Sequence, residues 1–148
     1  LFAREPHFDT IRSMKELTDG GTSSFTCMVV AEYLKDRLWE HIRRHNVIIK
    51  QKQDLPCETL AAHLVDTGAI WKQPRGGIFL WVRLPDSMDI PKLEALAEQR
   101  GVGYTPGRDY CPDKREVRCL RLSYAHLSLA EIEAGAEILA DCIRDACR

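Results

Sequence analysis

The spacing of apolar residues changes near the middle of the chain. Up to about residue 66, apolar side chains recur at helical intervals, whereas from residue 67 onward short apolar runs alternate with helical patterns. The first pattern predicts a helix over Pro6–Leu17 and a longer helix with candidate N-caps at Thr22, Ser23 and Ser24. We therefore expect one domain with two parts, a helical connecting segment over residues 1–66 and an α+β part over residues 67–148.

The longer helix is predicted to carry a wide apolar stripe and a charged opposite face. Pro56 interrupts the pattern, and a proline inside a helix removes one backbone hydrogen bond and clashes with the preceding turn. We expect a kink or a break near Asp54–Leu55. The basic cluster on this helix is interpreted as its solvated face rather than a phosphate site: Arg43, Arg44, Lys50 and Lys52.

The α+β part contains four runs that favour strands and two that favour helices. One helix is expected between a cap at Asp89 and a terminating Gly101, and the last opens with the capping-box pair Ser128 and Glu131. The strands are expected over residues 69–72, 78–84, 102–105 and 117–125. This order predicts an α+β fold in which a small, mostly antiparallel sheet has helices on one face, after a long helix that is either straight or kinked.

The strand expected over Val117–Ala125 carries the most informative side chain. Leu120, Leu122 and Tyr124 alternate onto one face, and Arg121 lies on the other among small, uncharged neighbours. Arginine offers a planar fork of donors that fits a carboxylate. Two interpretations follow from this strand alone: Arg121 holds a substrate carboxylate, or it is an exposed arginine on a half-solvated strand.

Composition narrows the class of protein. With 148 residues and a net charge of −1, the chain has the size of a single domain and no basic field for nucleic acid or an anionic membrane. The longest uncharged apolar run, Ile78–Val82, is far too short to span a bilayer. Because the chain begins Leu1-Phe2-Ala3 rather than with Met, we expect it to start inside a larger protein.

The six cysteines form no Cys-x-x-Cys pair, and no histidine lies beside them at zinc-ligand spacing. We expect reduced thiols in a cytoplasmic protein; a disulfide-stapled secreted domain is the alternative. His41 and His45 are four residues apart on a predicted helix, but no third ligand is in view, so no metal site is predicted.

Four segments taken in order resemble a known family. They are G-G-I-F-L-W-V-R-L-P from Gly76, T-P-G-R-D-Y from Thr105, R-C-L-R-L-S-Y-A from Arg118 and S-L-A-E-I-E-A-G from Ser128. This order closely resembles the C-terminal part of type I fold, pyridoxal-phosphate-dependent aminotransferases. The 2-aminoadipate and aromatic aminotransferase group is the most similar branch, and it includes the aminotransferase-like regions of some bacterial regulators.

The resemblance implies a role for several positions. Arg121 matches the arginine that binds the α-carboxylate of the substrate, and Thr22–Ser24 match a turn near the subunit interface and the partner's cofactor. The remaining positions border the substrate pocket in that family: Gly76, Gly77 and Phe79 in a glycine-aromatic segment, and Pro106, Gly107 and Tyr110 in a loop near the entrance.

The sequence also departs from the family. The segments that carry the Schiff-base lysine, the phosphate-binding arginine, the acid at the pyridine nitrogen and the stacking aromatic are not in these 148 residues. The resemblance therefore implies that this chain holds no catalytic residue and that pyridoxal phosphate binds only to the intact enzyme. That enzyme would be a homodimer with a large domain upstream of this chain. It would move an amino group between an amino acid and a 2-oxo acid. The alternatives are a ligand-sensing or interaction domain derived from this fold, such as part of a regulator, and an unrelated α+β domain.

Overall fold

The computed structural model describes residues 4–147, and the chain divides by its contacts into two compact units, residues 1–43 and 44–148. The first unit contains α1 (His7–Asp19) and the beginning of α2 (Ser24–His63). The hydroxyl oxygen of Ser23 accepts the backbone N–H of Thr26 at 3.3 Å, which confirms a cap in the predicted segment. Both predicted helices of this part are present.

Helix α2 runs without interruption through Pro56, so of the kink or break expected near Asp54–Leu55 the break is wrong, and the kink stays a prediction. Around the proline the helix is well covered: Gln53, Pro56, Cys57 and Leu60 are all buried. Packing within the second unit therefore offsets the hydrogen bond that proline cannot donate, because tertiary burial contributes more to helix stability than local preference does.

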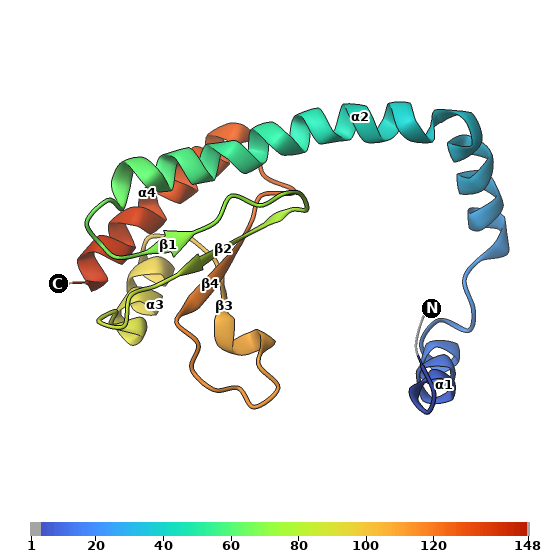
Figure 1. The fold of residues 1–148 in the computed structure, drawn as a ribbon, viewed down its shortest axis with the longest axis horizontal. Coiled ribbons are helices and arrows are strands. Elements are labelled where there is room, and N and C mark those ends of the chain that lie inside the picture. Colours follow the sequence, from blue (N-terminus) through green and yellow to red (C-terminus); the bar gives the residue numbers. More distant parts are fainter. Residues whose placement is uncertain (1–3, 148) are drawn as a thin grey trace. The chain divides into compact units, whose positions relative to one another are not determined.

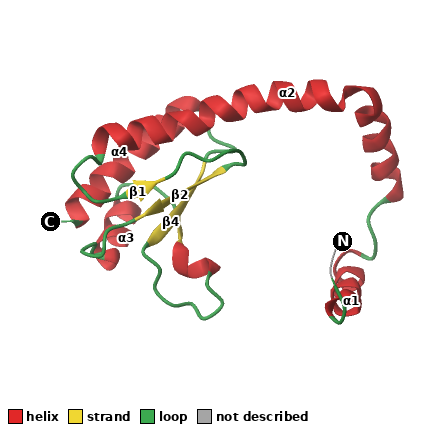
Figure 2. Ribbon diagram, in the orientation of Figure 1, coloured by secondary structure: helices red, strands yellow, loops and turns green. Residues whose placement is uncertain are grey.

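The second unit contains a four-stranded antiparallel sheet (Figure 2). Its spatial order is β1 (Ile70–Trp71), β2 (Phe79–Arg83), β4 (Cys119–Ser123) and β3 (Thr105–Pro106). Strand β3 begins later than the sequence pattern predicts. The reason is that the N–H of Val102 still bonds the carbonyl of Ala97 at 3.0 Å, so this residue completes the end of the preceding helix.

Three helical segments cover one face of the sheet, as predicted: the C-terminal part of α2, α3 (Ile90–Gln99) and α4 (Leu129–Ala146) (Figure 1). Leu80 and Val82 of β2 and Leu120 of β4 point into this core and are 0% exposed. Trp81, between the two core residues of β2, is 44% exposed on the opposite face. The α+β architecture of the sequence analysis is confirmed.

The predicted helix caps are present. The side chain of Asp89 accepts the backbone N–H of Lys92 at 3.0 Å, and Gly101 follows α3 with φ of +71°. Ser128 and Glu131 form a reciprocal capping box at the start of α4. Among the helices of residues 4–147, none has the length and apolar character needed to cross a membrane.

Gly107 opens a short 3-10 helix, η1 (Gly107–Tyr110), in close contact with β4. A Cβ at this position would lie 2.9 Å from the carbonyl oxygen of Cys119 and 3.1 Å from that of Val117. Gly107→Ala is expected to destabilise the protein by about 1–3 kcal/mol, because backbone must move to admit the methyl group. Urea unfolding followed by circular dichroism measures this.

Gly135→Ala is the matched control for that substitution. Gly135 lies inside α4, and a Cβ there meets nothing within 4 Å. The change should leave stability unaltered or raise it by up to about 1 kcal/mol, since alanine is the better helix former. Equal destabilisation by both substitutions would contradict the role of close approach at Gly107.

Glu131 connects the stability of α4 to pH. Hydrogen bonds from the side chain and then the backbone of Ser128 hold the pKa of Glu131 below its ordinary value. The contribution of Glu131 to the free energy of unfolding is therefore complete above its unfolded-state pKa, about 4.3. That contribution is lost as the pH falls through the lower folded-state pKa. Glu131→Ala should reduce stability at pH 7 and have a smaller effect at pH 3, whereas Glu133→Ala on the exposed side of α4 should show no such pH dependence.

Candidate functional site

Arg121 lies on the face of the sheet opposite the helices. In the register of the sheet it is opposite Trp81 of β2 and Thr105 of β3. Its guanidinium carbon is 3.9 Å from the centre of the Phe79 ring and 4.6 Å from the centre of the Tyr110 ring. Two aromatic rings thus contact the same guanidinium and shield it in part from water, which strengthens a cation–π interaction.

The guanidinium of Arg121 makes no hydrogen bond or ion pair with any described residue, and its Nε is buried. The two other partly buried arginines differ: Arg108 pairs with Glu94 at 2.5 Å, and Arg118 donates to the carbonyl oxygen of Met88 at 2.6 Å. A buried donor without a partner carries a desolvation cost. Arg121 is therefore the partly buried arginine in residues 4–147 that still needs an acceptor.

Tyr110 reaches Arg121 because η1 lies against β4. The close approach at Gly107 places the turn, and the ring of Tyr110 then meets the ring of Trp81 edge-on, at 5.1 Å between ring centres and 72° between ring planes. Phe79, Trp81, Tyr110 and Arg121 form one cluster, which we call the arginine–aromatic cluster. It joins three segments that are distant in the sequence.

An open groove runs from this cluster toward the edge of the sheet. Its lining includes Ile70 and Trp71 of β1 together with Phe79 and Trp81 of β2. Ile70 is 58% exposed, so the groove is apolar and open to solvent. Such a surface suits the apolar part of a small ligand or another piece of protein.

The structure brings together only some of the residues that the sequence predicted for the site. Phe79 and Tyr110 contact Arg121, whereas Gly76 and Gly77 lie on the turn that enters β2 and line a separate hollow beside α2. Gly77 has φ of +86°, a conformation that favours glycine, and its carbonyl accepts the hydroxyl of Tyr124 at 3.1 Å. The two glycines therefore shape the approach to β2, and their contact with a substrate stays a prediction.

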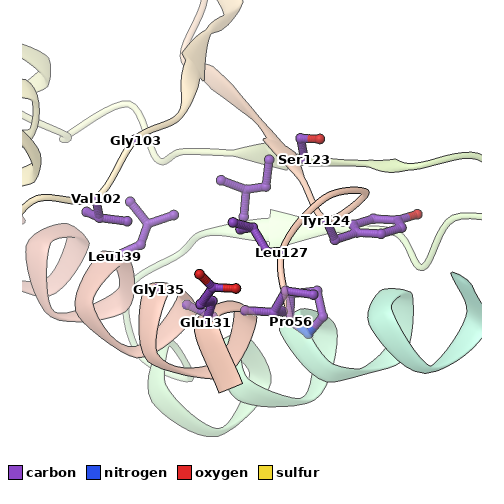
Figure 3. A pocket seen from close by; sticks show the side chains of 12 residues that line it. Pro56, Val102, Gly103, Ser123, Tyr124, Leu127, Glu131, Gly135 and Leu139 are labelled. Atoms are coloured by element: carbon purple, nitrogen blue, oxygen red, sulfur yellow. The ribbon is translucent and has the colours of Figure 1, made fainter. Parts of the chain in front are cut away.

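A second, smaller cavity lies on the helical side of the sheet (Figure 3). It has a volume of about 80 Å³ and is lined mainly by apolar side chains, among them Pro56, Leu127 and Leu139. The carboxylate of Glu131 is also there, and it is already engaged by Ser128 in the capping box. This cavity is a gap in helix packing, and most of its lining is apolar.

Burial lowers the reactivity of three of the six cysteines. All six are free thiols, and burial raises the pKa of Cys57, Cys142 and Cys147. A raised pKa keeps a thiol protonated and poorly nucleophilic at neutral pH. Within residues 4–147, no three side chains of histidine, cysteine, aspartate or glutamate gather at metal-binding distance.

Trp81 belongs to the cluster and was missed in the sequence analysis. A period-2 pattern was enough to find it, because Phe79, Trp81 and Arg121 share a face once the strands pair. Glu94 and Arg108 were also missed. Their ion pair joins α3 to η1, and no local spacing indicates a contact between those elements.

Chemically, the cluster is suited to hold an anion and to orient it. A guanidinium binds a carboxylate through two parallel N–H···O bonds, and partial burial strengthens those bonds. The side chains whose rings contact Arg121 are Phe79 and Tyr110, so they offer no amine and no carboxyl group. The arrangement can bind and position a carboxylate; a reacting group would have to come from elsewhere.

Known proteins share this fold and sequence. The aspartate aminotransferase family model matches residues 25–148. An aromatic-amino-acid aminotransferase of Thermococcus litoralis is 29% identical over 147 residues, covering 97% of this chain and 34% of that protein. An HTH-type transcriptional regulator of Bacillus subtilis, YdfD, is 30% identical over 132 residues, covering 88% of this chain and 27% of that protein.

A solved structure gives the same result. LysN, the α-aminoadipate aminotransferase of Thermus thermophilus, matches with a TM-score of 0.80 and 25% identity, covering 97% of this chain and 37% of that one. The chain thus spans about a third of the length of the relatives it matches. The match covers both the long helix and the sheet that carries Arg121, and the chain belongs to the aspartate aminotransferase family.

Proposed function

We propose that this chain is the part of a pyridoxal-phosphate-dependent aminotransferase that holds the α-carboxylate of the substrate, and that Arg121 is the residue that binds it. One observation supports the proposal above all. The guanidinium of Arg121 is partly buried against Phe79 and Tyr110 and has no anionic partner among the described residues. Amino acids and 2-oxo acids both carry the carboxylate that would supply this partner.

Pyridoxal phosphate supplies the electron sink that allows an amino group to leave the α-carbon. The side chains around Arg121 fit a carboxylate and provide nothing that would hold this cofactor. The role of this chain is then to bind the substrate and to fix the direction of its α-carbon. LysN, a relative, was solved with N-(5'-phosphopyridoxyl)-L-leucine, a compound that combines the cofactor with an amino acid. That complex supports the assignment of the cofactor to the intact protein.

The first unit supports the view that other protein covers it in the intact molecule. None of the residues 4–43 is buried, although Phe25 and Met28 of α2 are 77% and 71% exposed and Trp39 is 69% exposed. Apolar side chains in this number are rarely left in water. We propose that an upstream large domain and the second subunit of a homodimer cover them.

A second candidate function has its own support. YdfD, an HTH-type transcriptional regulator, is 30% identical to this chain. In a regulator the same arginine would bind an amino acid as a signal, and the chain would act as a sensing domain. Transamination by the intact protein favours the enzyme, whereas sequence-specific DNA binding that responds to an amino acid favours the regulator.

Arg121→Ala in the intact protein tests the carboxylate role. Loss of the guanidinium should raise KM for both the amino acid and the 2-oxo acid and lower kcat/KM by about tenfold or more, about 1.4 kcal/mol. Steady-state kinetics with each substrate measures it. Arg144→Ala is the control, because Arg144 is exposed on α4, on the helical side of the sheet, and does not line the groove beside the arginine–aromatic cluster. A decrease of less than tenfold for Arg121→Ala, or an equal decrease for both variants, would count against the proposal.

A further inference from the structure

The position of Tyr110 depends on an ion pair outside the arginine–aromatic cluster. Tyr110 is the last residue of η1, and Arg108 lies two residues before it. Nη1 of Arg108 is 2.5 Å from Oε1 of Glu94 on α3 and 3.8 Å from Oε2 of Glu116, in the loop that leads into β4. One guanidinium therefore joins α3, η1 and the segment before β4.

Burial makes Glu94 the more important of the two acidic partners. Oε1 of Glu94 is inaccessible to solvent and makes no hydrogen bond of good geometry, so the charge of Arg108 is its main compensation. The interaction also raises the pKa of Arg108, with Glu94 as the first cause. Removing the charge of Arg108 leaves Glu94 without a cationic partner among the described residues, whereas removing that of Glu94 leaves Arg108 only the more distant Glu116, at 3.8 Å.

The ring of Tyr110 has little else to hold it in place. It is 44% exposed, and its ring contacts in the described structure are Trp81 and Arg121. The backbone of η1 is fixed at Gly107 by its approach to β4, and the Arg108 side chain is its tie to α3. A shift of η1 would therefore move the aromatic ring away from the guanidinium of Arg121.

We propose that Glu94 is a positioning residue that, through Arg108, holds η1 so that Tyr110 lies over Arg121, and thereby sets the affinity of the site for a carboxylate. This inference rests on the proposed function, because it assigns a carboxylate to Arg121. Glu94 itself touches neither the arginine nor the bound anion. Glu94 affects carboxylate binding only through the position of the Tyr110 ring.

The experiment uses the intact protein with its cofactor and the variants Glu94→Gln and Arg108→Gln, singly and together. Each single substitution should raise KM for the amino acid about three- to tenfold with kcat within about twofold of the original. The double variant should be no worse than either single one, because both remove the same link. Glu94→Asp, which keeps the charge, should recover part of the loss.

Glu98→Gln is the matched control, since Glu98 is exposed on the same helix one turn later. It should leave both kinetic constants unchanged. If Glu94→Gln lowers thermal stability and kcat together without a selective change in KM, the residue is merely structural and the inference is wrong. The same conclusion follows if the effects of the two single substitutions simply add.

Binding of 3-phenylpropionate, an unreactive carboxylate, separates this inference from the function on which it rests. Calorimetry should show weaker binding for Arg121→Ala and, to a lesser degree, for Glu94→Gln. If Arg121→Ala binds it as well as the original protein does, the proposed function fails and the positioning role fails with it. If Arg121→Ala weakens binding and Glu94→Gln does not, the proposed function stands and only the role of Glu94 is overturned.

Discussion

The pairing of β2 with β4 is the constraint on which both the core and the site depend. With Trp81 opposite Arg121, the residues on either side of them, Leu80 and Val82, face Leu122 and Leu120 in the core. A slip of one residue would exchange the two faces. It would place a guanidinium among fully buried leucines and expose the residues that now hold the helices. Burial of the apolar face therefore fixes the register, and the register in turn decides where the arginine lies.

The site is built on the face that the helices leave open. β2 supplies Phe79 and Trp81, β4 supplies Arg121, and η1, which follows β3 directly, adds Tyr110. Strands hold side chains more firmly than loops do, so the arginine and two of the rings have fixed positions. Tyr110 alone comes from a short turn, which is why its support by Arg108 and Glu94 matters to the shape of the whole cluster.

Much of the fold could be predicted from the sequence, because the sequence patterns that specify its helices and strands are local. The capping box at Ser128 and the alternation around Arg121 act within a few residues, and both are present in the structure. The break expected near Pro56 is absent. The cost of a proline in a helix is local, whereas the burial that offsets this cost comes from distant parts of the chain. The resemblance placed Arg121, Phe79 and Tyr110 at or near one substrate pocket, and the contacts among them come from the structure. Their geometry depends on strand register and on the path of η1, which no short pattern specifies.

The buried Nε of Arg121 also has a consequence for the stability of the folded protein. An unsatisfied buried donor raises the free energy of the folded state, and a carboxylate that bonds to it removes that cost. Any molecule that binds only the folded form shifts the unfolding equilibrium in proportion to the logarithm of its concentration. If Arg121 binds a carboxylate as proposed, the folded fraction of the protein should rise with the concentration of that carboxylate.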